Sequence, residues 1–149
     1  MRALTDRLKP IFAFSGRTSR LGYWRTQAGL ALATAVVLTL TVLATQAGGW
    51  LGAVPSLLFL PVLVAGLAVA VRRLHDRGKP AWWIAVFAAG PYALSGLASG
   101  LYAGDSPLIL AAPLLALAAL GLSIWAWVEL GFLRGARGDN RYGAEPARR

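Results

Sequence analysis

Four long apolar runs dominate this sequence and limit what it can fold into. They cover roughly residues 26–47, 51–71, 81–101 and 108–131, and Glu129 is the one charged residue inside them. About 20 helical residues cross a hydrocarbon core of about 30 Å, so each run is long enough to span a membrane. Backbone polar groups in lipid must be satisfied internally, and the runs lack the strict alternation of barrel strands. The sequence therefore predicts an all-α membrane protein with a four-helix transmembrane bundle.

The composition agrees with this class and excludes an ordinary soluble domain. Hydrophobic residues make up 57% of the chain and charged residues 14%, whereas soluble proteins average about 25% charged residues. The chain has no cysteine and a single histidine, while zinc sites usually need several His or Cys ligands. We therefore expect one four-span membrane domain over residues 1–149, with no disulfide, no metal and no cofactor.

The positions of the charges predict how the chain is threaded. Every Lys and Arg of this chain of net charge +9 lies in residues 2–25, 72–79 or 134–149. The other two connections, at residues 46–52 and 102–107, contain no basic residue. Basic loops stay on the cytoplasmic side, so both termini are predicted to be cytoplasmic (N-in/C-in). The first residues, 1 to about 13, are expected to form a short interfacial segment, and the tail 134–149 to be cytoplasmic. Because orientation explains the charge, no nucleic acid partner is expected.

The polar sequence is concentrated in three motif segments, at residues 14–25, 72–83 and 138–143. In the third segment, Gly138 and Gly143 flank Asn140 and Arg141, which predicts a tight turn, and Tyr142 is expected to dock the tail under the helices. The residues expected to have structural roles in the three segments are Gly16, Tyr23, Trp24, Gly78, Trp82, Trp83, Asn140, Arg141, Tyr142 and Gly143.

Taken together, the three segments resemble the motifs of a family of bacterial inner-membrane proteins, the domain-of-unknown-function family 805. The order and spacing of the segments and the four-span layout are similar over essentially the whole chain. One departure is Pro80-Ala81, where the family pattern has a pair similar to Ser-Gly. The resemblance implies a multi-pass protein of the bacterial cytoplasmic membrane with a four-helix fold. It implies no established activity.

Two neighbouring residues are the candidates for catalysis, His75 and Asp76. Asp76 lies one helical turn after Arg72 and three residues after Arg73, so its carboxylate can pair with either. Such a pair would fix the end of the helix, or it would hold the guanidinium groups in place for a phosphate. Adjacent residues do not face each other on a helix. His75 would therefore act alone near neutral pH, or with an acid from another segment.

Glu129 is the only acid expected near the membrane interior. An ionised carboxylate there is costly unless it is paired. Pairing with Arg25, Arg72 or Arg73 would join two helices, whereas an unpaired Glu129 would be a candidate proton or cation site.

The leading functional hypothesis is a non-enzymatic module whose basic cytoplasmic face binds anionic lipid headgroups. Each basic group near an anionic surface contributes about 1 kcal/mol. A membrane-protein partner or a second copy of the chain is the other expected kind of partner. The alternatives are a small enzyme or carrier for a phosphate-bearing substrate that uses His75 and Asp76, and a proton or cation path through Glu129. The residues expected to bind the anion are Arg17, Arg20, Arg72, Arg73 and Lys79.

Overall fold

The structure, a computed structural model, describes residues 9–103 and 107–147. Its helical elements are η1 (Lys9–Ile11), α2 (Arg20–Ala47), η2 (Gly49–Gly52), α3 (Ala53–Ser56), α4 (Phe59–Asp76), η3 (Ala85–Ala89), α5 (Gly90–Ala103), η4 (Ile109–Ala111), α6 (Ala112–Trp127) and η5 (Val128–Phe132). The expectations for residues 1–8 of the interfacial segment and for the turn around Asp105 fall outside the described residues.

The described residues are all-helical, as predicted, and contain no strand. Three helices are long and apolar enough to cross a membrane: Arg20–Ala47, Gly49–Asp76 and Ile109–Phe132. The fourth, α5, is shorter. It follows a π-helical turn, η3. Pro91 has no N–H and its ring would clash with the carbonyl one turn back, which explains why the helix widens just before it.

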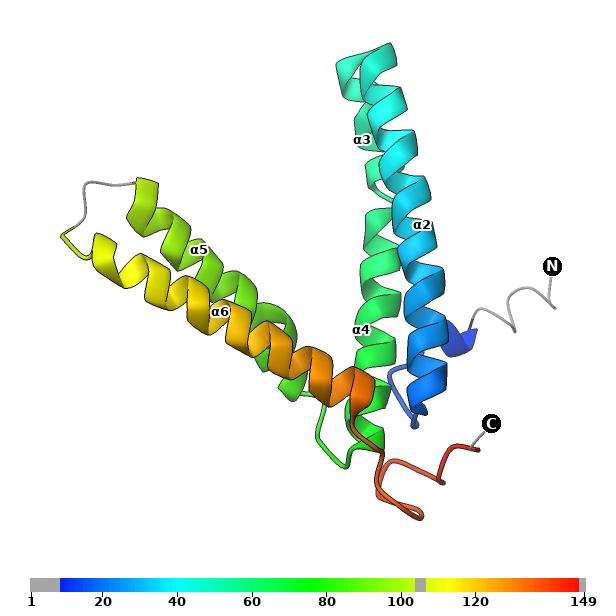
Figure 1. Ribbon diagram of the computed structural model, residues 1–149. Coiled ribbons are helices and arrows are strands. Elements are labelled where there is room, and N and C mark those ends of the chain that lie inside the picture. Colours follow the sequence, from blue (N-terminus) through cyan, green and yellow to red (C-terminus); the bar gives the residue numbers. More distant parts are fainter. Residues whose placement is uncertain (1–8, 104–106, 148–149) are drawn as a thin grey trace.

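The four helices form two hairpins, and this arrangement differs from the predicted single bundle. The helix α2 lies along α3 and α4, and α5 lies along α6. The two hairpins meet near the start of α2 and the end of α4, which we call the basic end, and diverge from it in a V (Figure 1). Lipid chains are as apolar as leucine side chains, so no hydrophobic force closes such a gap in a membrane.

The hydrophobic core lies where the two hairpins meet. Its buried residues come from both hairpins: Tyr23, Val69, Ala70, Leu74, Phe87, Ala126 and Leu130. Away from the basic end, large apolar side chains are exposed, as with Leu32 at 69% and Leu117 at 63%. Exposure of this kind along a span is expected for a surface that faces lipid. The packing therefore fixes the basic end and leaves the far ends of the hairpins apart.

Two caps set the helix ends at the basic end. Ser19 is the N-cap of α2, and its Oγ accepts a hydrogen bond of 3.1 Å from the Gly22 N–H. Gly78 has a φ of +73°, a left-handed conformation that favours glycine. Beyond it the Lys79 N–H donates back to the Leu74 carbonyl at 2.9 Å. This reversal ends α4 and directs the chain toward Trp82 and Trp83.

Candidate functional site

The three motif segments meet at the basic end, where buried charged side chains connect them. Within the described residues, the polar or charged residues that are buried as whole residues are Arg73, His75, Asp76 and Glu129. They lie at the end of α4 and in η5, the turn that follows α6. Burying charge is unfavourable unless each group is paired and hydrogen-bonded, so the partners of these four residues define the site.

Asp76 is held between two arginines. Arg17 donates from Nε to Asp76 Oδ1 at 3.1 Å, with its Nη2 at 3.0 Å, and Arg73 pairs with Oδ2. The side chains of Arg17, Arg73 and Asp76 are 1%, 0% and 5% exposed. The predicted pairing of Asp76 with a neighbouring arginine is confirmed for Arg73. Arg72 instead donates to the Ala68 carbonyl at 3.4 Å.

Arg73 also caps the end of the last helix. It donates to the carbonyls of Leu130, at 2.8 Å, and Leu133. The last carbonyls of a helix have no partner inside the helix and carry the negative end of its dipole. The carbonyls between and after these two accept from other side chains: Gly131 from Trp24 at 3.0 Å, Phe132 from Arg20 at 3.2 Å, and Arg134 from Arg77.

Arg17 ties the tail to the helices. Besides Asp76, it donates to the carbonyls of Ala136 at 2.7 Å, Gly138 at 2.7 Å and Gly143 at 3.2 Å. A side chain near the start of the chain therefore holds a loop near its end. We call residues 134–145 the tail loop.

The tail loop has the predicted tight turn and docks on His75. Asn140 and Gly143 exchange backbone hydrogen bonds of 3.1 and 2.9 Å. The Tyr142 ring stacks on the His75 ring with centroids 3.9 Å apart and planes within 3°. His75 Nδ1 lies 3.2 Å from the Gly16 carbonyl, so a proton on Nδ1 would satisfy that contact. The prediction that Tyr142 docks the tail is confirmed.

The candidate catalytic residues lie close together but do not share a reactive pocket. The Asn140 amide donates to the backbone carbonyl of His75 at 3.0 Å and not to its ring. The Asp76 carboxylate faces the two arginines. Each side chain is thus engaged with a different structural partner. Within the described residues, no group of three or more His, Cys, Asp or Glu side chains is placed to hold a metal ion.

Glu129 is paired, but not with the arginines expected from the sequence. The expectation of Arg25, Arg72 or Arg73 is wrong: Glu129 Oε1 lies 3.0 Å from Arg77 Nε and 3.0 Å from Lys79 Nζ. The turn at Gly78 brings both cations over the end of α6. Lys79 also lies 4.5 Å from the centre of the Trp83 ring, a distance typical of a cation–π contact. Arg77 and Lys79 were missed because the apolar pattern does not encode the direction of the turn after α4.

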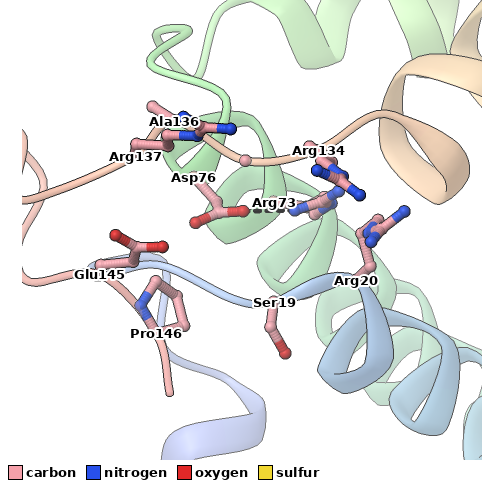
Figure 2. Close-up of a pocket in the computed structure, with 10 residues that line it drawn as sticks. Ser19, Arg20, Arg73, Asp76, Arg134, Ala136, Arg137, Glu145 and Pro146 are labelled. Atoms are coloured by element: carbon pink, nitrogen blue, oxygen red, sulfur yellow. Dashed lines mark hydrogen bonds and ion pairs between the residues drawn. The ribbon is translucent and has the colours of Figure 1, made fainter. Parts of the chain in front are cut away.

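A polar pocket of about 260 Å³ opens beside the buried ion pairs (Figure 2). Its lining residues are Ser19, Arg20, Arg73, Asp76, Arg134, Gly135, Ala136, Arg137, Glu145 and Pro146. Figure 2 shows the side chains of Arg20 and Arg134 gathered beside Arg73. Arg134 and Arg137 were missed as candidates, although the sequence places them directly after the last apolar run.

The pocket carries an excess of positive charge. Arg20, Arg134 and Arg137 are exposed, and none of them forms an ion pair with another residue in the described part of the chain. Four arginines and two acids, Asp76 and Glu145, line it. Guanidinium groups bind phosphate and carboxylate oxygens with two parallel hydrogen bonds, so the chemistry of this pocket suits an anion.

Comparison with known proteins gives one match. The sequence model of a family described as "Protein of unknown function (DUF805)" matches residues 11–144. No curated protein and no solved structure matches the chain.

Proposed function

As the chain belongs to the DUF805 family, we propose that it is a multi-pass protein of the bacterial cytoplasmic membrane that binds anionic lipid headgroups at its basic end. Both termini lie in the cytoplasm in this proposal, because basic segments stay on that side of the membrane. The observation that carries the proposal is the pocket at the basic end, with three exposed arginines around it.

The cations that bind the headgroup differ from those expected from the sequence alone. Arg17, Arg73 and Lys79 hold internal partners, so they position the site and do not bind the ligand. Arg72 reaches only the Ala68 carbonyl. Arg20 remains from the original set, and Arg134 and Arg137 join it. The buried pairs keep the tail loop in place, and the tail loop presents the two added arginines.

The surroundings of the pocket favour a lipid over a free anion. Arg20 is bonded to the carbonyl of Phe132, whose ring is in edge contact with Trp24 at 5.8 Å and Trp127 at 5.9 Å. Trp127 and Phe132 are 63% and 54% exposed. Tryptophan is enriched at the level of lipid headgroups. A lipid whose phosphate lies at Arg20 and Arg134 would have its acyl chains beside these rings.

The test is a titration of the purified full-length chain in detergent with phosphatidylglycerol, followed by native mass spectrometry. Arg20→Gln and Arg134→Gln should each weaken binding about fivefold, because one basic group contributes about 1 kcal/mol. Arg25→Gln is the matched control, since Arg25 is exposed and does not line the pocket. It removes the same charge and should leave binding nearly unchanged.

Two further ligands distinguish a lipid headgroup from a free anion as the bound molecule. Phosphatidylcholine should bind more weakly than phosphatidylglycerol, and inorganic phosphate should fail to displace the bound lipid. Displacement by inorganic phosphate would identify a site for a free anion instead. Equal losses in Arg20→Gln and Arg25→Gln would mean that the pocket has no special role.

The other hypotheses gain no support from the geometry. An enzyme that uses His75 and Asp76 needs both side chains in one pocket, and each is engaged separately. A proton path needs a polar cavity beside Glu129. Hydroxyl groups of the spans that could line such a cavity bond to their own helices instead, as Thr34 does with Leu30 at 2.8 Å and Ser123 with Ala119 at 2.8 Å.

A further inference from the structure

One face of α5 carries a row of hydroxyl groups. Tyr92, Ser95, Ser99 and Tyr102 follow one another at intervals of three and four residues, which places them on a single side of a helix. All four are exposed, Tyr92 at 82% and Tyr102 at 58%. We call these four residues the hydroxyl face.

If α5 crosses the membrane as the fourth span, on which this inference rests, the hydroxyl face lies at membrane depth. The helix enters after Trp82 and Trp83 and ends near Tyr102, and these aromatic residues are of the kind that marks the two interfaces. Tyr92 is midway between them, about 15 Å from either at 1.5 Å per residue. A tyrosine near the middle of a bilayer is far from the interface where its hydroxyl finds water.

Elsewhere in the spans, hydroxyls are satisfied by their own helix. Each donates to a carbonyl four residues earlier, over 2.7–2.9 Å, in Thr26, Thr34, Thr39, Thr41, Thr45 and Ser123. Within the described residues, the side chains of Tyr92, Ser95 and Ser99 form no hydrogen bond. Lipid chains offer them none, whereas a neighbouring helix with hydroxyl groups would supply hydrogen bonds.

The surface beside these hydroxyls is hollowed and lined mainly by small residues. A groove of about 380 Å³ between α5 and α6 is lined by Ser95, Ala98, Ser99, Tyr102, Ala116, Ala119, Leu120 and Ser123. A Cβ added to Gly96, next to Ser95, would meet no atom within 4 Å. Small residues and hydroxyls are what transmembrane helices use to approach each other closely.

We propose that the hydroxyl face of α5 binds the same face of a second copy of this chain. A hydroxyl is both a donor and an acceptor, so two identical faces can satisfy each other. The face carries no charge that would repel its copy. Two copies inserted with the same orientation run parallel, so a two-fold axis along the membrane normal places each residue opposite its counterpart.

The absence of cysteine from the chain makes disulfide formation a direct test. Single cysteines are placed in the full-length protein at Tyr92, Ser95 and Ser99, and the membranes are oxidised. These variants should form disulfide-linked dimers. Leu97→Cys is the matched control, because Leu97 is exposed at 61% on the same helix but points about 200° away from Ser95 and Ser99.

Loss of the hydroxyls gives a second, independent measurement. In the double variant S95A/S99A, energy transfer between labelled copies in detergent should show association about tenfold weaker, the scale of hydrogen bonds between transmembrane helices. Helix content by circular dichroism shows that the variant folds.

Three results would overturn the proposal. One is cross-linking of Leu97→Cys as strong as that of Ser99→Cys. Another is unchanged association of S95A/S99A. The third is cross-linking of the face only to a different membrane protein, because the partner would then not be a second copy.

Discussion

At the basic end, Gly135 packs directly against the buried carboxylate of Asp76. A Cβ added to Gly135 would lie 2.0 Å from Asp76 Oδ2, which is overlap. The tail loop can therefore pass over the Asp76–Arg73–Arg17 group only because residue 135 has no side chain. Close approach is one of the two reasons for glycine at a fixed position.

Gly135→Ala should destabilise the protein by about 1–3 kcal/mol, because the Asp76 carboxylate must move and weaken its ion pairs. Gly121→Ala is the control, since a Cβ there meets no atom within 4 Å. It should be neutral or should stabilise α6 by up to about 1 kcal/mol. The free energy of unfolding from titration with sodium dodecyl sulfate measures both. Similar values for the two variants would contradict the tight fit at Gly135.

At this scale the sequence predicted contacts that helical spacing encodes and missed the others. Arg73 and Asp76 are three residues apart on α4, and their pairing was predicted. Arg17 reaches the same carboxylate from 59 residues away, and no local pattern carries that information. Glu129 was assigned to the wrong arginines for a similar reason: its partners, Arg77 and Lys79, flank Gly78 at the turn after α4, where helical periodicity no longer applies.

At the level of elements, the backbone carbonyls at the end of the last helix bond to side chains from the first hairpin. The carbonyls of residues 130–134 accept from Arg73, Trp24, Arg20 and Arg77. The final turn, η5, is π-helical, with the Leu133 N–H donating to the Val128 carbonyl at 3.2 Å. Arginine thus replaces the glycine or asparagine cap common at helix ends.

Arg73→Gln should therefore lower the free energy of unfolding by about 3–5 kcal/mol, the cost of breaking a buried ion pair. The change also leaves the carbonyls of Leu130 and Leu133 without a donor. Arg72→Gln, its neighbour on α4, should cost about 1 kcal/mol or less, because its one bond is a long one to Ala68. Detergent-denaturant titration compares the two, and equal losses would rule out a special role for Arg73.

Three of the four predicted apolar runs correspond to helices long and apolar enough to cross a membrane, whereas α5 is shorter than its run. The expected run 108–131 and the observed helix Ile109–Phe132 nearly coincide. The two π-helical turns were not predicted. One precedes Pro91, where the missing N–H and the ring force a local change. The other depends on contacts between hairpins, which hydropathy does not describe.

For the whole molecule, the decisive feature is that the hairpins are joined at one end only. Hydropathy predicts that four helices cross the membrane but not which of their faces touch, because lipid competes equally with helix for every apolar face. No specific force therefore supported the expectation that the four helices pack as a single bundle. Polar residues at the basic end supply the specificity, and Arg17 holds the tail loop there.

Arg17→Gln should release the tail loop and expose it to protease. Trypsin cleavage after Arg137 and Arg141, both exposed, should become at least about tenfold faster, since cleavage follows the population of the open form. Arg25→Gln removes one arginine as well and should cleave like the unmodified protein. Mass spectrometry of the fragments identifies the sites. An unchanged rate in Arg17→Gln would show that other contacts, such as the stacking of Tyr142 on His75, suffice.

The bonds from Arg17 to residues 136–143 also set an order of events during synthesis. A growing chain is synthesised from its N-terminus, so all four helices have been synthesised before the carbonyls that Arg17 binds exist. Until then, Asp76 is the only one of these partners of Arg17 that has been synthesised. Docking of the tail loop onto Arg17 is therefore the last step in the assembly of the basic end.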